Sequence, residues 1–350
     1  MKVKIVQLDG TMMNLALSKI ARHHLNRGDS VSFDEPNPDL IYYGAIFDWT
    51  AKKFKNQQSL AGKQIFGGYP FNDDQLPPEI DSLMPVYDLW GVDYSLGYTS
   101  RGCIRHCDFC IIPKKEGRIR NNQFVGHFHD PKHKKIILLD NNFFASPEWR
   151  VNLDYINDAA LRVSFCQGLD LRIMTEEIAG RLADTHSEGH TFSGRQYFFA
   201  WDNIKDEPEI RSGLEFLKDA GVKSDSIYVY VLVGFDSTFE TDLYRCQVLW
   251  NEYRVHPFAM RFNNDKSDPR VNALSRWACR PACHRNHTWD QYWAKYGRRA
   301  ITLSAQSAGA RPATINDTSL EPMAAELGAT NAMSMYTSKF ALPNAITRRR

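Results

Sequence analysis

Six short apolar segments between residues 94 and 262 constrain the fold of this 350-residue chain more than any other feature. The stretches that separate the later segments repeat apolar residues with helical spacing. Strands that alternate with helices predict an α/β fold with a parallel sheet, curved or closed like part of a (β/α) barrel. The predicted strands are 94–100, 135–140, 162–167, 196–201, 227–235 and 258–262. The predicted helices are 146–161, 175–184, 209–221 and 237–254.

A smaller strand–helix–strand series precedes these segments. Residues 2–8 read as a strand, and a helical face follows that Gly28 closes. The strand–helix–strand order over this length of chain predicts a small, mostly parallel, Rossmann-like α/β domain at residues 1–88. The predicted helical face is Leu15, Leu17, Ile20, Ala21 and Leu25, and the further strands are 29–33, 38–44 and 63–70.

The remaining chain is expected to divide at two places. The polar, proline-containing stretch 71–81 predicts a connector, and residues 89–300 are expected to form the barrel and its extension. Residues 301–350 shift to Ala, Ser, Thr and isolated prolines, which is typical of a flexible tail.

Composition narrows the class of protein. Hydrophobic residues make up 43% and charged residues 24%, as in ordinary globular proteins. We expect no membrane span, because no apolar run approaches about 18–20 residues. Seven cysteines without a secretion signal favour free or metal-bound thiols over disulfides, so we expect a cytoplasmic protein.

Three of the seven cysteines lie within eight residues, just after the first barrel strand. Cys103, Cys107 and Cys110 form a C-x3-C-x2-C pattern. Structural zinc usually takes four protein ligands. A [4Fe–4S] cluster held by three thiolates leaves one iron open to a further ligand. The alternatives are a zinc site completed by His106 or Cys283, and three unrelated buried thiols.

With Phe109 directly before the last cysteine, the pattern resembles the signature of the radical S-adenosylmethionine (radical SAM) enzymes. The resemblance spans roughly residues 94–262, where the strand series is similar to that family's partial (β/α)6 barrel. It implies a [4Fe–4S] cluster whose open iron chelates S-adenosylmethionine (SAM). Reduction by a protein such as flavodoxin or ferredoxin would then give a 5′-deoxyadenosyl radical that abstracts hydrogen from an unidentified substrate.

The resemblance also implies SAM contacts at the ends of the strands. Phe109 would lie against the adenine, and Asp140, Asn141 or Asn142 would bind the ammonium where the family usually has a Gly-Gly-Glu-like segment. A turn before Ser146, expected to cap the first predicted helix, is the alternative for those three residues. The other implied contacts are Asp170 and Arg172 near the SAM carboxylate, Asp202 and Asn203 at the ribose, and Val233 and Gly234 beside the adenine. The alternatives are an ion pair for Asp170 and Arg172 and an ordinary buried strand for Val233 and Gly234. For Glu240, near the start of the helix that follows, we expect the role of a capping acid rather than a SAM contact.

Missing motifs separate the chain from two radical SAM groups. The first 102 residues contain no cysteine, unlike those of methylthiotransferases. The N-terminal domain loosely resembles cobalamin-binding domains, but their Asp-x-His-x-x-Gly motif is absent, so cobalamin is not supported. His23 and His24 are instead expected to be solvated late in a helix.

The remaining cysteines and the charges give weaker signals. Cys166 and Cys246 are expected in the core. A second metal site at Cys279 and Cys283 is the less favoured interpretation of that pair. Residues 101–135 hold nine Lys or Arg against three acids. Such a segment would suit a phosphate-bearing substrate or nucleic acid, or simply form a solvated loop. A non-catalytic iron–sulfur or zinc binding module is the alternative function.

Overall fold

The computed structural model describes residues 1–47, 50, 54, 62–68, 71–72 and 74–297. Its N-terminal part is a four-stranded sheet with the order β2-β1-β3-β4, in which all neighbours are parallel. These elements are β1 (Lys2–Gln7), α1 (Leu15–Asn26), β2 (Ser30–Ser32), β3 (Leu40–Gly44) and β4 (Lys63–Gly67). The predicted parallel α/β arrangement of this part is confirmed. The proposed tail at 301–350 lies outside the described residues.

Helix α1 covers this sheet through part of its predicted face. Leu17 and Ala21 are buried against the strands, and Gly28 follows the helix with φ of +80°, a left-handed conformation that glycine adopts easily. Two expectations were wrong. Leu25 is 40% exposed. His24 is buried rather than solvated, because Asp29 and Tyr42 hydrogen-bond its two ring nitrogens.

The six predicted barrel strands are all present. They run parallel to their neighbours and occur in chain order, in one sheet of β5-β8-β9 and another of β10-β11-β12-β13. They are β5 (Tyr94–Gly97), β8 (Lys135–Leu138), β9 (Arg162–Phe165), β11 (Tyr197–Ala200), β12 (Ile227–Val233) and β13 (His256–Arg261), with the short β10 (Leu169–Asp170) beside β11. This confirms a mixed α/β fold with parallel sheets.

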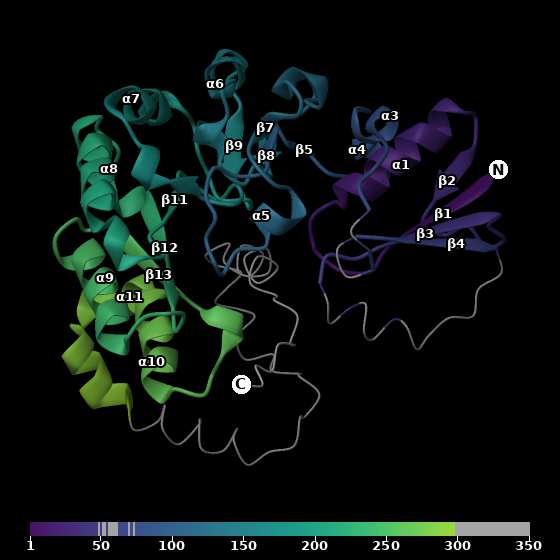
Figure 1. Ribbon diagram of the computed structural model, residues 1–350. Helices are drawn as coiled ribbons and strands as arrows, with labels where there is room; N and C mark the ends of the chain where they lie inside the picture. The colour runs from purple at the N-terminus through teal and green to yellow at the C-terminus, as the bar shows by residue number, and fades with distance from the viewer. Residues whose placement is uncertain (48–49, 51–53, 55–61, 69–70, 73, 298–350) are drawn as a thin grey trace.

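The helices that follow these strands lie along the outer side of the sheets (Figure 1). Thr175 and Thr238 cap two of them by accepting hydrogen bonds from Ile178 and Thr241. They are α6 (Trp149–Asp158), α7 (Glu176–Asp184), α8 (Glu207–Asp219), α9 (Phe239–Asn251), α10 (Pro269–Ala278) and α11 (Pro281–Asn286), and residues 289–297 are also helical.

The predicted N-cap of the first barrel helix was wrong. Helix α6 begins at Trp149, with Glu148 in the capping position. Ser146 instead donates a hydrogen bond from its hydroxyl to Asn121, and this contact holds it one turn before the helix.

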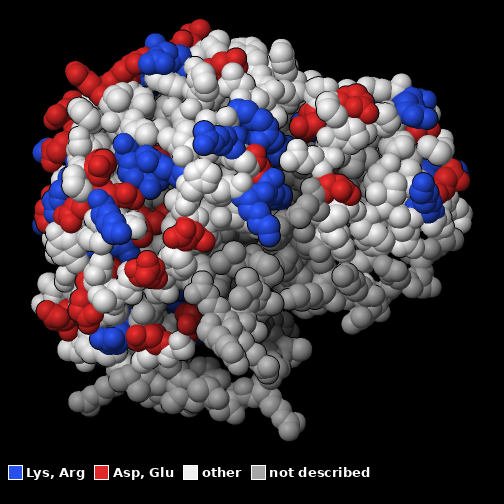
Figure 2. Space-filling view, viewed as in Figure 1, with Lys and Arg blue, Asp and Glu red and all other residues white. Residues whose placement is uncertain are grey.

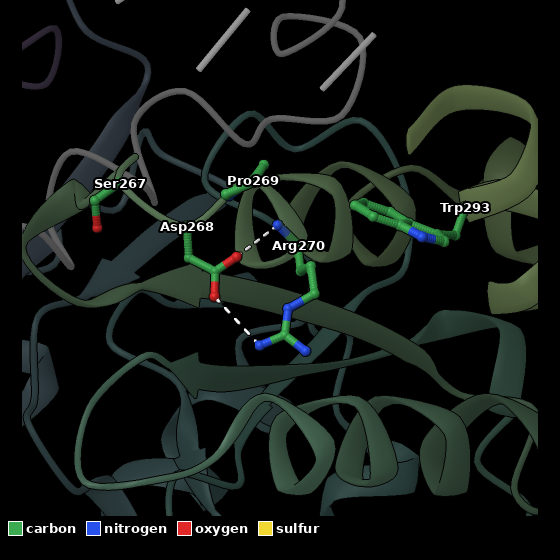
Figure 3. Close-up of a pocket in the computed structure, with 5 residues that line it drawn as sticks. All are labelled: Ser267, Asp268, Pro269, Arg270 and Trp293. Atoms are coloured by element: carbon green, nitrogen blue, oxygen red, sulfur yellow. Dashed lines mark hydrogen bonds and ion pairs between the residues drawn. The ribbon is translucent and has the colours of Figure 1, made fainter. Parts of the chain in front are cut away.

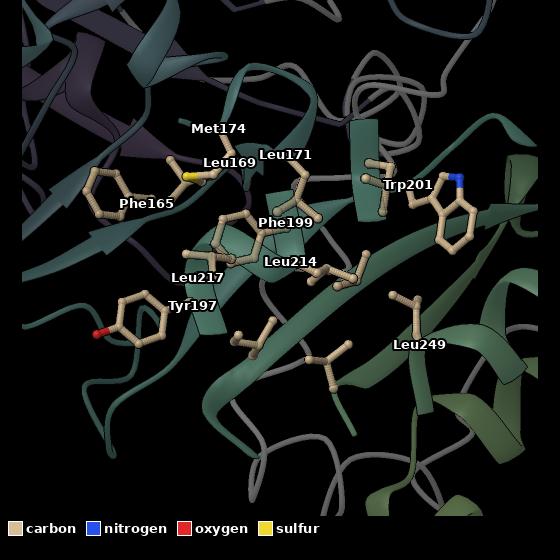
Figure 4. Packing of buried hydrophobic residues seen from close by; sticks show 14 of the residues in the cluster. Phe165, Leu169, Leu171, Met174, Tyr197, Phe199, Trp201, Leu214, Leu217 and Leu249 are labelled. Carbon is tan, nitrogen blue, oxygen red and sulfur yellow. The ribbon is translucent and has the colours of Figure 1, made fainter. Parts of the chain in front are cut away.

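The main core fills the space between the sheets and their helices. Figure 4 shows rings and branched side chains from β9, β11, α8 and α9 meeting there, including Phe165, Phe199 and Leu217. Each such side chain contributes about 1.5–3 kcal/mol on burial. Cys246 belongs to this core, and Cys166 is buried in a second cluster beside Leu96, as expected for both.

Short elements connect the two parts and precede β8. Tyr87 ties the connection to the barrel, because its hydroxyl accepts from Leu96 N at 3.1 Å and donates to Phe128 O at 2.5 Å. These elements are α3 (Pro78–Asp81), α4 (Tyr87–Trp90), β6 (Ser100–Arg101), α5 (Ile112–Lys115) and β7 (Arg120–Asn121). Within the described ranges, no helix has the length and apolar character needed to cross a membrane.

Candidate metal centre

The three clustered cysteines lie on a closed loop that leaves the carboxyl end of β5. Cys103 N donates to Gly117 O at 3.2 Å, and Cys110 N donates to Cys107 O at 2.9 Å. Gly102 has φ of +78°, and a Cβ there would lie 2.3 Å from Arg118 O. Only glycine fits this approach, so the residue before the first cysteine lets the loop close.

The thiols lie within electrostatic reach of one another. Burial raises the pKa of the Cys107 thiol to about 11, and the Cys110 and Cys103 thiols also raise it. The Arg172 guanidinium acts in the opposite direction. Because metal ligation requires thiolates, a bound cation would offset the cost of ionising this buried thiol. Among the residues that the structure describes, no three or more His, Cys, Asp or Glu side chains are arranged to hold a metal ion.

Asp170 is the centre of a charged network beside the cysteine loop. It accepts hydrogen bonds from Arg105 Nε at 3.1 Å, Arg172 Nε at 2.6 Å and Asn142 Nδ2 at 3.1 Å. Burial works to raise the pKa of Asp170, but the hydrogen bond and charges of the two arginines leave it below its ordinary value. Arg172 also holds Asp206 at 3.0 Å. The sequence prediction missed Arg105, although this residue lies between two of the cysteines.

The structure separates the three residues expected at the SAM ammonium. Asp140 is fully engaged, because it accepts four hydrogen bonds from the backbone and hydroxyl groups of Thr99 and Ser100, at 2.6 to 3.0 Å. Asn141 donates to Glu116 at 2.7 Å. Asp140 and Asn141 therefore support the backbone around the cysteine loop.

Asn142 has a different environment. Its Nδ2 donates to Asp170 and lies 3.7 Å from Cys103 Sγ. Its Oδ1 is buried and has no hydrogen-bond partner among the described residues. A buried acceptor without a donor costs about 1–3 kcal/mol, so this oxygen is suited to a donor on a ligand.

Glu116 is a loop residue that the sequence prediction missed. Its buried carboxylate accepts from Gly102 N at 3.0 Å and from Asn141, and it lies 3.5 Å from Arg101. The available signal was one acid among four basic residues in KKEGRIR. Glu116 holds the residue before Cys103 in place.

An ion-pair chain extends from Glu116 to the N-terminal part. Arg101 lies 3.7 Å from Asp81 of α3, and Asp81 lies 2.9 Å from the Lys19 ammonium of α1. The side chain of Lys19 is only 2% exposed. Helix α1 is thereby connected to the cysteine loop through charged groups.

The candidate ribose residues follow β11. Asp202 accepts from Leu232 N at 3.2 Å and contributes to the electrostatic environment of Cys107. Asn203 accepts from Lys205 N and caps the short helix Ile204–Asp206. Asp202 is thus close enough to Cys107 to act on its charge, whereas the side-chain oxygen of Asn203 accepts from the local backbone.

The candidate adenine residues lie near the carboxyl ends of β12 and β13. The Phe109 ring packs edge-on against Phe235, with ring centroids 5.6 Å apart. Val233 ends β12, and Gly234 N donates to Asp242 at 2.8 Å. Val233 and Gly234 line a hollow of about 230 Å³. Phe109 therefore brings the cysteine loop to the ends of β12 and β13.

Glu240 stands at the start of a helix, as expected, but it is not the residue that caps it. It lies in the first turn of α9 and forms an exposed ion pair with Arg270 at 3.3 Å, while Thr238 caps the helix.

A larger, open recess of about 550 Å³ lies at the start of α10 (Figure 3). Asp268 caps that helix by accepting from Arg270 N at 2.7 Å, and its carboxylate lies 3.7 Å from the Arg270 side chain. The charged groups of Asp268 and Arg270 therefore pair with each other in this recess.

The remaining cysteines lie in packed surroundings. Cys279 donates to Ala259 O at 3.3 Å, and burial raises the pKa of its thiol to about 11. Cys283 packs against the main core. The neighbouring His284 hydrogen-bonds His256 at 2.9 Å.

Comparisons with known proteins give no family. No family model matches the chain, and no curated protein matches it. Among solved structures, dihydropteroate synthase from Xanthomonas albilineans with 7,8-dihydropteroate is similar at 14% identity and a TM-score of 0.21, covering 98% of this chain and 93% of that one. A dihydropteroate synthetase with a product is similar at 10% identity and a TM-score of 0.20, covering 96% and 92%. Likenesses this weak carry no argument.

Proposed function

We propose that this protein is a radical SAM enzyme with a [4Fe–4S] cluster on Cys103, Cys107 and Cys110. The observation that carries the proposal is the position of Asn142. Its amide nitrogen contacts Cys103, and its buried oxygen has no hydrogen-bond partner in the part of the chain that the structure describes. Three thiols in one loop supply a donor set that leaves one iron of such a cluster open. When bound, the cluster would supply the electron that cleaves SAM to methionine and a 5′-deoxyadenosyl radical.

The chain's own residues would hold the ligand and exclude water. Asn142 Oδ1 would accept a hydrogen bond from the SAM ammonium, as its burial and missing donor favour. Asp202, close enough to influence Cys107, would accept from a ribose hydroxyl. Phe109 and Val233 would form the apolar side of the adenine site.

Arg105 is the better candidate for the SAM carboxylate than Arg172. Arg172 already binds two carboxylates, those of Asp170 and Asp206. Arg105 pairs with Asp170 through Nε and lies on the cysteine loop itself. An arginine fork has further donors to offer a carboxylate.

The fold supports this proposal. Six parallel strands in chain order are the arrangement expected of a partial (β/α)6 barrel, and the cysteine loop leaves the carboxyl end of the first. The substrate remains an unidentified hydrogen donor.

Metal analysis of anaerobically purified protein tests the proposal. We expect a brown protein with about four irons per chain, as one [4Fe–4S] cluster requires. Cys103→Ala should lose the iron. Cys283→Ala, which removes another partly buried thiol outside the cysteine loop, should retain it. Colourless protein with one zinc per chain, lost in Cys283→Ala, would instead support the binding-module alternative.

A further inference from the structure

The structure divides the basic segment 101–135 into separate groups. Strands β5 and β8 are parallel, with Tyr94 opposite Lys135. Lys132 and Lys134 therefore lie before β8, at the amino edge of the sheet, whereas the cysteine loop leaves the carboxyl edge. Arg101 and Arg105 form ion pairs with acidic groups. The nine basic residues of the segment therefore do not form one continuous face.

Four exposed cations lie close to the cysteines in the chain. We define the basic patch as Lys114, Lys115, Arg118 and Arg120, which lie on or next to α5 and β7. Figure 2 shows Lys and Arg side chains gathered over this region. Their nearest acid in sequence, Glu116, is buried beneath them and faces the loop backbone.

The patch lies directly against the loop that carries the thiols. Cys103 N donates to Gly117 O, and Gly102 packs on the carbonyl of Arg118. Phe109 extends from the same loop toward Phe235 at the strand ends. Ile104, next to Cys103, is 43% exposed. The loop thus has an inner side at the strand ends and an exposed side that is basic with one apolar residue.

We infer that the basic patch is the docking surface for an acidic one-electron donor protein. This inference rests on the proposed function, because reductive SAM cleavage consumes one electron per event. The donor protein is oxidised by one electron and the cluster is reduced by one. Electron-transfer complexes are typically small and transient, and opposite charges steer their association. Four exposed cations next to a loop that also exposes the apolar Ile104 fit such a partner.

The same features disfavour a nucleic acid at this surface. Single-stranded nucleic acids are usually held by stacking on aromatic side chains along a long cationic groove. The patch covers only residues 114–120, and the exposed apolar residue beside it is the aliphatic Ile104. The chain as a whole carries a net charge of only +2.

Binding of a strongly acidic flavodoxin to the full-length, cluster-loaded protein tests the inference. The affinity should fall as salt rises, because screening weakens charge attraction. Lys114→Glu/Arg118→Glu should weaken binding by about tenfold or more and flatten the salt dependence. Lys132→Glu/Lys134→Glu makes the same charge change at the opposite edge of the sheet and should leave the affinity unchanged.

A second readout follows reduction of the cluster. The rate with flavodoxin hydroquinone, divided by the rate with the small cation reduced methyl viologen, should fall in the patch variant only. The inference would be overturned if both double variants lowered this rate ratio equally, or if the patch variant left it unchanged. It would also be overturned if the patch variant lost binding of an RNA or DNA oligonucleotide but still bound flavodoxin normally. Salt-sensitive flavodoxin binding without SAM cleavage would leave docking in place and contradict the proposed function instead.

Discussion

At the scale of single residues, Asn142 links the charged network to the cysteine loop. Its amide nitrogen donates to Asp170 and contacts Cys103, while its oxygen is left without a partner among the described residues. Its neighbours Asp140 and Asn141 are committed to Thr99, Ser100 and Glu116. The three adjacent polar residues therefore have different roles.

Asn142→Ala should weaken SAM binding by about 1–3 kcal/mol, the cost of one buried hydrogen-bond partner. Equilibrium binding of SAM to the cluster-loaded protein measures this. Asn286→Ala, a change of the same kind at an exposed residue of α11, serves as the control and should bind SAM like the unmodified chain. Equal affinities of Asn142→Ala and the control would exclude the role given to Asn142.

His284 predicts a pH dependence of stability. Burial, together with the charge of the neighbouring His256, lowers its pKa to about 4. An unfolded histidine titrates near pH 6.5, so between about pH 6.5 and 4 the unfolded chain binds a proton that native His284 does not. The contribution of neutral His284 to the free energy of unfolding is therefore fully present above this window. It is lost as pH falls, by up to about 1.4 kcal/mol per pH unit.

His284→Gln should flatten that slope in urea unfolding measured across the window. His127→Gln, at an exposed histidine, should leave the pH slope of the unfolding free energy unchanged. Parallel pH profiles for His284→Gln and the unmodified protein would contradict the account of this buried histidine.

At the scale of elements, the cysteine loop depends on a close backbone approach and on charges from outside the barrel. Gly102 allows the loop to close against Arg118, and Glu116 holds it from the other side. The chain Lys19–Asp81–Arg101 then reaches α1. The loop is supported from both parts of the molecule.

Gly102→Ala should prevent cluster binding while the barrel core stays folded. The added Cβ would meet a backbone carbonyl at 2.3 Å, which only movement of the loop could relieve. Gly91→Ala is the matched control, because Gly91 also has positive φ but open space around its Cβ position. Iron content and far-ultraviolet circular dichroism measure the two effects, and full iron binding by Gly102→Ala would show that the loop tolerates the change.

Asp81→Ala should destabilise the protein by about 3–5 kcal/mol, because it leaves the buried Lys19 ammonium without its carboxylate. The double variant Lys19→Met/Asp81→Ala should recover part of that loss, since no buried charge remains. Urea unfolding of the single and double variants measures the difference. A double variant less stable than Asp81→Ala would show that the pair does not act in this way.

At the scale of the whole molecule, periodicity was enough to locate the strands. All six barrel strands and the parallel N-terminal sheet follow from apolar patterning, because burial selects the same residues that the pattern detects. The cysteine spacing likewise located the candidate site. The sequence already offered an ion pair between Asp170 and Arg172, which are neighbours in the chain, and the structure contains it. The ion-pair chain through Lys19, Asp81 and Glu116 could not be predicted, because these residues are far apart in sequence and meet only through tertiary packing. Leu25 and His24 were misjudged for the same reason, since the packing of α1 on its sheet decides which of them is buried.

The most direct test of the central claim is SAM cleavage by the anaerobically reconstituted, reduced protein. SAM should perturb the electron paramagnetic resonance spectrum of the cluster, and 5′-deoxyadenosine and methionine should then form in equal amounts, slowly even without substrate. Asp202→Ala should weaken SAM binding, and Cys103→Ala should abolish cleavage. A fully loaded cluster that neither responds to SAM nor cleaves it, with His106 or Cys283 on the fourth iron, would contradict the account.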